Sequence, residues 1–123
     1  MKRVLVIDDA TTVRMYYRSI LEAAGIQVEE AFNGIEGLEK ALQTPFDLYV
    51  VDVNMPKLDG YGFLRELRAM AIPQSPAIMV STEAGAQDQE QAFAAGANVY
   101  LVKPVKPEPL LLHVRLLLGD GPA

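Results

Sequence analysis

The chain contains 123 residues, a length that predicts one globular domain with a single core. Its net charge of −5 disfavours nucleic acid as a direct partner, because proteins that bind nucleic acids usually carry basic patches. The absence of cysteine excludes disulfides, thiol catalysis and Cys-ligated zinc, and it agrees with a cytoplasmic location. The apolar run at 4–7 is too short for a signal peptide or a membrane span, so we expect a soluble protein with no membrane partner.

Short apolar runs alternate with segments of helical periodicity along the whole chain. In chain order we predict a strand at 4–7, a helix at 13–24, a strand at 27–31, a helix at 35–42, a strand at 46–51, a helix at 61–70, a strand at 77–80, a helix at 84–95, a strand at 99–102 and a helix at 107–118. There is no internal repeat, low-complexity tract or linker.

Several residues predict where these helices begin and end. The segment Ala10-Thr11-Thr12 is expected to cap the first helix, and Asn33-Gly34 is expected to form a turn. Gly25 and Gly96 are expected to end helices, as glycine often does. The last helix is expected to start at Pro107, since proline is tolerated in a first helical turn.

Strands that alternate with helices predict a parallel sheet with helices on both faces. Five such units with short loops suit a single doubly wound α/β domain of the flavodoxin-like strand order 2-1-3-4-5. Ligands bind beyond the carboxyl ends of strands in such sheets, at the point where the strand order reverses. Here that point lies between the first and third strands, so Asp8, Asp9 and Asp52 are expected to meet there, with Ser81 and Lys103 arriving from the fourth and fifth strands.

Three carboxylates in one pocket raise each other's pKa unless they share a cation. Mg²⁺ fits such a pocket because it prefers oxygen ligands, and a backbone carbonyl near Asn54 would supply another oxygen. Asp52 is then a plausible nucleophile toward phosphorus, since aspartyl phosphates are known covalent intermediates. Lys103 suits pairing with a phosphoryl oxygen, and Ser81 or Thr82 offers a hydroxyl donor to a second one.

Each of these residues also has a purely structural interpretation. The pair Asp8-Asp9 on its own is more often a helix cap, and Ser81 can satisfy local backbone groups. Tyr100 can be a half-buried aromatic on an edge strand, and Glu83 a surface acid. Asp59-Gly60 is interpreted as a turn and a cap for the third helix.

Five segments of the chain resemble the receiver domain of two-component response regulators, and especially the single-domain chemotaxis regulators. The segments, in order and at the spacing of that family, are Val6-Ile7-Asp8-Asp9, Asp52-Val53-Asn54-Met55-Pro56-Lys57-Leu58-Asp59-Gly60, Met79-Val80-Ser81-Thr82-Glu83-Ala84, Ala95-Gly96-Ala97 and Tyr100-Leu101-Val102-Lys103-Pro104. Together they extend over essentially the whole chain.

The resemblance implies a Mg²⁺-dependent reaction in which a sensor histidine kinase phosphorylates Asp52. It assigns Asp9, Asp52 and the Asn54 carbonyl as Mg²⁺ ligands, Asp8 as a ligand through water, and Lys103 as the group that holds the phosphoryl oxygens. The domain would then catalyse only its own phosphorylation and dephosphorylation, and would not be an enzyme in the wider sense.

The resemblance also implies a switch. Ser81 and Tyr100 occupy the positions at which the family has its switching hydroxyl and aromatic ring, and the neighbourhood of Thr82 and Glu83 tunes dephosphorylation in the family. The Lys103-Pro104 bond would be cis. Phosphorylation would change how the surface of the fourth helix, fifth strand and fifth helix binds a downstream protein.

Two features depart from the chemotaxis regulators. Val105 stands where they have an aromatic residue, which would alter the rim of the pocket. The last helix is apolar around much of its circumference, and its exposed part would suit a partner or a homodimer through this helix, or lie under its neighbours. Residues 119–123 would end a 1–123 receiver domain with no output domain, unless the chain is part of a longer protein.

Three other functions share part of this pattern. A Mg²⁺-dependent phosphatase with an aspartyl nucleophile commonly places a second Asp two residues later, where this chain has Asn54 and no cap domain. A flavodoxin-like cofactor binder would share the strand order but should have a phosphate-cradling loop, and none is evident. An unphosphorylated pseudo-receiver would act only as an interaction module, and the intact acid and lysine set disfavours it.

Overall fold

The computed structural model describes residues 1–119 and contains five strands and five helices within them. In chain order these elements are β1 (Arg3–Ile7), α1 (Thr11–Ala23), β2 (Gln27–Ala31), α2 (Gly34–Gln43), β3 (Leu48–Asp52), α3 (Gly60–Ala69), β4 (Ala77–Ser81), α4 (Ala86–Ala95), β5 (Val99–Val102) and α5 (Pro107–Leu118). Every predicted strand and helix is present, and the alternation of the two is confirmed.

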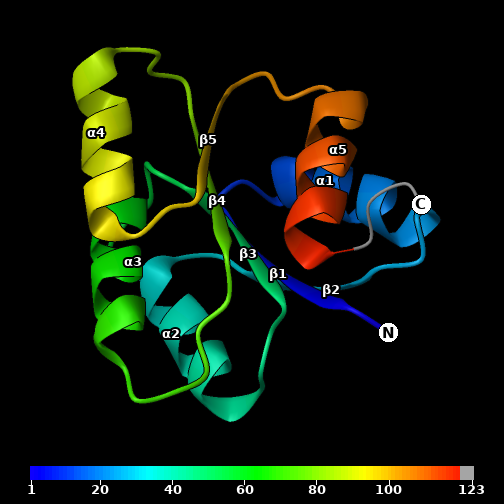
Figure 1. The fold of residues 1–123 in the computed structure, drawn as a ribbon, viewed down its shortest axis with the longest axis horizontal. Helices are drawn as coiled ribbons and strands as arrows, with labels where there is room; N and C mark the ends of the chain where they lie inside the picture. The colour runs from blue at the N-terminus through cyan, green and yellow to red at the C-terminus, as the bar shows by residue number, and fades with distance from the viewer. Residues whose placement is uncertain (120–123) are drawn as a thin grey trace.

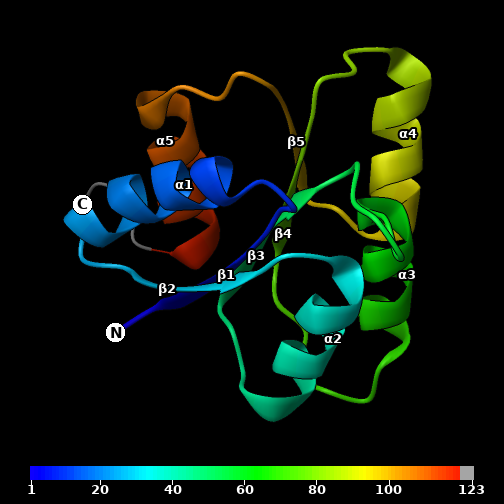
Figure 2. The ribbon, with the colours of Figure 1, turned by 180° about the vertical axis from the view of Figure 1, so that it is seen from behind.

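The strands form one parallel sheet in the order β2-β1-β3-β4-β5, as the sequence predicted. Helices α1 and α5 cover one face of this sheet, and α2, α3 and α4 cover the other (Figure 1). The view from behind shows the same two layers on either side of the strands (Figure 2). From β1 the chain continues to β2 on one side, and from β3 it continues to β4 on the other side. The strand order therefore reverses between β1 and β3, which are neighbours in the sheet.

Each central strand contributes side chains to two separate cores. On β1, Leu5 and Ile7 pack in the core beneath α2, α3 and α4, whereas Val4 and Val6 pack in the core beneath α1 and α5. All five residues of β3 and all five of β4 are buried. A strand buried on both faces needs apolar residues at consecutive positions, and this is why these strands appear in the sequence as unbroken apolar runs.

Some predicted boundaries were wrong by one or two residues. Strand β3 begins at Leu48, not at 46, and it includes Asp52; β4 likewise includes Ser81. Helix α4 begins at Ala86, not at 84, because the loop from β4 continues through Gly85, the N-cap of the helix. These strands extend through a polar residue because the backbone ladder continues there with its neighbours, a feature that an apolar pattern does not reveal.

The starts of α1 and α2 differ in detail from the predicted cap at Ala10-Thr11-Thr12 and the predicted turn at Asn33-Gly34. Helix α1 begins at Thr11 with Ala10 as its N-cap, and no side chain caps it; the backbone N–H of Ala10 instead donates to Asp8 Oδ1 at 2.9 Å. Asn33 is not part of a simple turn but the N-cap of α2, since its Oδ1 accepts from the backbone N–H of Glu36 at 2.8 Å. The predictions for α3, α4 and α5 were confirmed: the Asp59 side chain caps α3, Gly96 ends α4 in the left-handed region with a φ of 118°, and α5 starts at Pro107.

Helix α5 buries one stripe and exposes another. Leu110, Val114 and Leu118 pack against the sheet, whereas Leu112 is 52% exposed and Leu116 is 56% exposed. The prediction about the end of the chain concerns residues 119–123, of which 120–123 lie outside the described residues. Among the helices of residues 1–119, none combines the length and the apolar character needed to cross a membrane.

Candidate functional site

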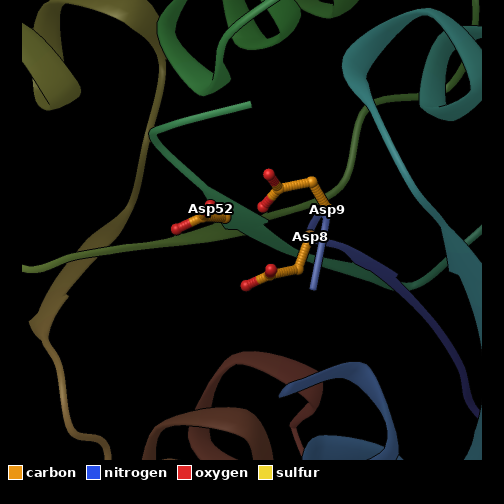
Figure 3. Close-up of side chains that lie close together, drawn as sticks. All are labelled: Asp8, Asp9 and Asp52. Atoms are coloured by element: carbon orange, nitrogen blue, oxygen red, sulfur yellow. The ribbon is translucent and has the colours of Figure 1, made fainter. Parts of the chain in front are cut away.

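Three carboxylates meet at the carboxyl ends of β1 and β3. Asp52 is the last residue of β3, and Asp8 and Asp9 follow directly after the last residue of β1. Each offers an oxygen within 4.8 Å of the others, and their side chains extend from the two adjacent strand ends into one region (Figure 3). Asp8 and Asp52 are buried, whereas Asp9 is exposed. The register that pairs Ile7 with Val51 places the next residues, Asp8 and Asp52, side by side.

Lys103 enters this pocket from the segment that follows β5. Its Nζ lies 2.8 Å from Asp52 Oδ1 and 3.3 Å from Asp8 Oδ2, so one ammonium bridges two of the three acids. Its backbone N–H donates to the carbonyl oxygen of Ser81 at 2.7 Å, which ties the end of β5 to the end of β4. The Lys103-Pro104 bond is cis, as the sequence predicted.

The electrostatics of the pocket are dominated by burial and by the crowding of negative charge. Burial raises the pKa of Asp52 to about 6, with Asp8 and Asp9 adding repulsion and Lys103 opposing both. Burial alone would lower the pKa of Lys103, but its hydrogen bonds and charge interactions with Asp52 and Asp8 outweigh that effect and raise it. The carboxyl group of Asp52 is therefore costly to ionise until a further positive charge enters the pocket.

The donor set suits a hard divalent cation. Three carboxylates and one ammonium leave a net charge of −2, and every available ligand atom is an oxygen. Oxygen ligands of this kind are those that Mg²⁺ prefers, and the exposed position of Asp9 leaves room for the waters that Mg²⁺ usually keeps. Asn54 lies exposed two residues beyond Asp52, and its role as a ligand stays a prediction.

The two predicted switch residues converge on one loop residue. Ser81 is fully buried at the end of β4, and its Oγ accepts from the backbone N–H of Glu83 at 3.1 Å. Tyr100 is half-buried on β5, and its hydroxyl donates to the carbonyl oxygen of Glu83 at 2.6 Å. Thr82 and Glu83 themselves are exposed. Both side chains thus already satisfy backbone groups of the β4–α4 loop, and their switching role stays a prediction.

The sequence interpretation missed the part of α1 that faces this site. Tyr16 and Tyr17 appeared only as helix positions with apolar periodicity, yet the Tyr16 hydroxyl donates to the carbonyl oxygen of Val105 at 2.9 Å. Tyr17 is almost fully buried, and burial raises its pKa to about 12, with Lys103 opposing the rise and Asp8 and Asp52 adding to it. Nothing local to α1 indicates what packs against it. The one sequence feature that pointed to this region was the small residue at Val105.

The chain is similar to known proteins along nearly its whole length. The family model of the response regulator receiver domain matches residues 4–115. The transcriptional regulatory protein ResD of Bacillus subtilis is 34% identical over 116 residues, which cover 94% of this chain and 48% of ResD. The transcriptional regulatory protein PrrA of Mycobacterium leprae is 38% identical over 116 residues, covering 94% of this chain and 49% of PrrA. This chain thus spans about half the length of these two relatives.

Solved structures give the same result for the fold. The chemotaxis protein CheY4 of Vibrio cholerae superposes with a TM-score of 0.90 at 36% identity, covering 95% of this chain and 98% of that one. A CheY-like receiver domain protein of Methanospirillum hungatei has a TM-score of 0.90 at 32% identity, covering 98% of this chain and 95% of that one. Sequence and structure agree along nearly the whole length, and this chain belongs to the response regulator receiver domain family of two-component signalling.

Proposed function

We propose that this receiver domain accepts a phosphoryl group on Asp52 and that the modified site changes how the domain binds its partners. The observation that supports this is the contact of 2.8 Å between Asp52 Oδ1 and Lys103 Nζ, made in a pocket with two further carboxylates. The arrangement supplies a nucleophilic oxygen and, beside it, a positive charge for the phosphoryl oxygens.

The donor is a sensor histidine kinase. An oxygen of Asp52 forms a bond to phosphorus while the bond from phosphorus to the imidazole nitrogen breaks, and the electron pair leaves on that nitrogen. Lys103 exchanges its contact with the Asp52 carboxylate for one with a phosphoryl oxygen, and a hydroxyl of Ser81 or Thr82 donates to another. Small acyl phosphates can serve the same site, because their phosphorus is attacked in the same way.

Mg²⁺ is the cofactor of this proposal, held by Asp9, Asp52 and the Asn54 carbonyl, with Asp8 acting through water. Bound there, it would neutralise the carboxylates and the phosphoryl oxygens together. The raised pKa of Asp52 agrees with a pocket that lacks one positive charge. The chain's own residues then orient the phosphoryl group, through Lys103 from one side and the end of β4 from another.

Phosphatase activity toward external substrates is not expected. Asn54 stands two residues after the nucleophile, and an amide cannot transfer the proton that a leaving group requires. The domain is therefore proposed to be a signalling domain that acts catalytically only on itself.

The output is proposed to pass through α4, β5 and α5. Large apolar side chains are exposed on all three elements: Phe93 at 49% on α4, Val102 at 39% on β5, and Leu112 and Leu116 on α5. Tyr100 connects this face to the β4–α4 loop through its bond to Glu83. Because that loop also receives Ser81, a shift of the hydroxyl toward a phosphoryl group would alter both contacts and thereby the face. A downstream protein, or a second copy through α5, would bind there.

The surroundings of this domain are also proposals. The net charge of −5 and the absence of cysteine support a cytoplasmic domain that contacts protein and not nucleic acid. One relative is named as a DNA-binding transcriptional regulator, RpaA of Synechocystis, and this chain covers about half of its length. The absence of nucleic-acid contacts is therefore proposed for the receiver domain alone.

Intact mass after incubation with acetyl phosphate and Mg²⁺ tests the central proposal. The wild type should gain one phosphoryl group, and the gain should vanish with chelator or in Asp52→Asn. Asp88→Asn, which changes an acid on α4 outside the pocket, provides the matched control and should be labelled like the wild type. No gain in the wild type, under conditions that label another receiver domain, would contradict the proposal and favour an interaction module that is never phosphorylated.

A further inference from the structure

A cavity of about 350 Å³ lies beside the acidic pocket, between α1 and the segment that follows β5. Its walls are mainly apolar, formed by Val13, Tyr16 and Tyr17 of α1 and by Val105 across from them. Lys103 belongs to both this cavity and the acidic pocket, as its Nζ lies 2.8 Å from Asp52 Oδ1. A group attached to a phosphoryl oxygen at Lys103 would therefore be next to the cavity.

The walls of the cavity are held in place by contacts between distant parts of the chain. The Tyr16 hydroxyl donates to the carbonyl oxygen of Val105 at 2.9 Å, which fixes one wall to the other. The rings of Tyr16 and Tyr17 lie 5.7 Å apart at an angle of 51° and form a continuous aromatic surface. Val105 is buried and small, so the space in front of it is not filled by its own side chain.

Tyr17 brings a hydroxyl group to this cavity, which Lys103 and Thr82 also line. Its side chain is 3% exposed and lines the cavity, and its hydroxyl makes no hydrogen bond to any residue within 1–119. Among the described residues Arg3 Nε is the one fully buried side-chain polar atom without a partner, so the Tyr17 hydroxyl is not sealed off and can be reached from the cavity. Burial raises the pKa of Tyr17 to about 12, so the hydroxyl keeps its proton and remains a donor. A ligand with one acceptor oxygen and an apolar body would satisfy these surroundings.

We propose that this cavity receives the acyl group of a small acyl phosphate, and that it favours an aromatic acyl group over acetyl. The inference rests on the proposed phosphorylation of Asp52 and names the class of small donor that the site prefers. An Asp52 oxygen forms the bond to phosphorus, and the bond between phosphorus and the acyl oxygen breaks. The electron pair leaves on that oxygen, which departs as a carboxylate and needs no proton or other reactant.

The size and charge of the site favour this class of ligand. A volume of about 350 Å³ is at the lower end of the range for small-molecule sites, and an acetyl group would leave most of it empty. The aromatic acyl group is uncharged before transfer, with its carbonyl oxygen as the acceptor for Tyr17. The carboxylate formed by the transfer is charged, and the mainly apolar walls of the cavity solvate a charge poorly, which favours its release.

Benzoyl phosphate and acetyl phosphate are the probes, and the ratio of their second-order rate constants for labelling Asp52 is the measurement. Val105→Phe fills the cavity from one wall, and Leu42→Phe makes the same kind of change at an exposed site on α2. We expect the benzoyl-to-acetyl ratio to fall roughly tenfold or more in Val105→Phe and to stay at the wild-type value in Leu42→Phe. Because only the ratio is compared, any difference in intrinsic reactivity between the two donors cancels.

Equal ratios in the wild type and Val105→Phe, with labelling by both donors, would overturn this inference and leave the phosphorylation of Asp52 intact. Labelling by neither donor would overturn both. If Val105→Phe does not fold, Val13→Leu adds one methylene to the opposite wall and serves the same comparison.

Binding of a ligand that cannot transfer a phosphoryl group, measured in the absence of metal, provides an independent readout. Benzamide, a neutral stand-in for the leaving group, should shift the backbone amide resonances of Tyr16, Tyr17 and Val105 in the metal-free protein, and acetamide should not. The shifts should be lost in the variant with the filled cavity. Unshifted amides at saturating benzamide would overturn the inference.

Discussion

Replacing Asp52 by asparagine should stabilise the metal-free protein at neutral pH, although it removes the proposed phosphoacceptor. Asparagine resembles a protonated aspartate in shape and carries no charge. In the folded protein burial raises the pKa of Asp52 from 3.8 to about 6, so the ionised carboxylate opposes folding at pH 7. The ion pair with Lys103 is already included in this balance, and it does not overcome the burial and the repulsion from Asp8 and Asp9.

The size of the effect follows from the change in pKa. One pKa unit corresponds to about 1.4 kcal/mol, so a rise from 3.8 to about 6 corresponds to roughly 3 kcal/mol at pH 7. Because the folded-state pKa lies above the unfolded-state value, Asp52 favours folding most below the unfolded-state value. That contribution is lost as the pH rises through about 6. The advantage of Asp52→Asn should therefore be about 3 kcal/mol at pH 7, about half of that at pH 5, and negligible below the unfolded-state pKa.

Urea denaturation in chelator at several pH values measures this difference, with Glu39→Gln, an exposed acid on α2, as the matched control. In a parallel thermal unfolding experiment at pH 7, the melting temperature of Asp52→Asn should exceed that of the wild type by roughly 10 °C. Mg²⁺ should then stabilise the wild type more than the variant, since the variant lacks one of the carboxylates. An Asp52→Asn protein that is no more stable than the wild type at pH 7, or an advantage that does not change with pH, would refute the reasoning.

Three further predictions concern the frame around the site. Gly60→Ala would place a Cβ 2.4 Å from the backbone oxygen of Asp52. The variant should therefore lose about 1–3 kcal/mol of unfolding free energy in urea and be phosphorylated more slowly. A variant as stable as the wild type would show that this close contact does not constrain the residue. Arg68→Ala removes two guanidinium hydrogen bonds to the carbonyl oxygen of Gly96, at 3.1 and 2.8 Å. The unfolding free energy measured in urea should fall by about 1–3 kcal/mol, and Arg68→Lys should recover part of this loss. Lys103→Met removes the cation 2.8 Å from Asp52 and should slow labelling by acetyl phosphate at least about tenfold at saturating Mg²⁺. The rate is measured by intact mass, and an unchanged rate would show that the lysine does not contact the phosphoryl group.

The grouping of the acidic residues and the lysine was predictable because it depends on local patterns and a general rule of topology. The apolar runs that end at Asp8 and Asp52 are buried strands, and the carboxyl ends of parallel strands meet at one edge of the sheet. Lys103 was predicted at the same edge for the same reason, and the structure places its Nζ 2.8 Å from Asp52. The chemical roles of these residues rest on the proposal and on the family.

The sequence by itself determined the alternation of strands and helices and the residues at the strand ends, since both follow from the period and burial of short segments. The strand order was predicted from the general topology of doubly wound sheets. The tertiary structure alone decided what these segments contact. It set the missing side-chain cap of α1, the bond from Tyr100 to Glu83, and the cavity between α1 and Val105. The last two of these features join residues far apart in the chain, and no local periodicity encodes which side chains meet when two elements pack together.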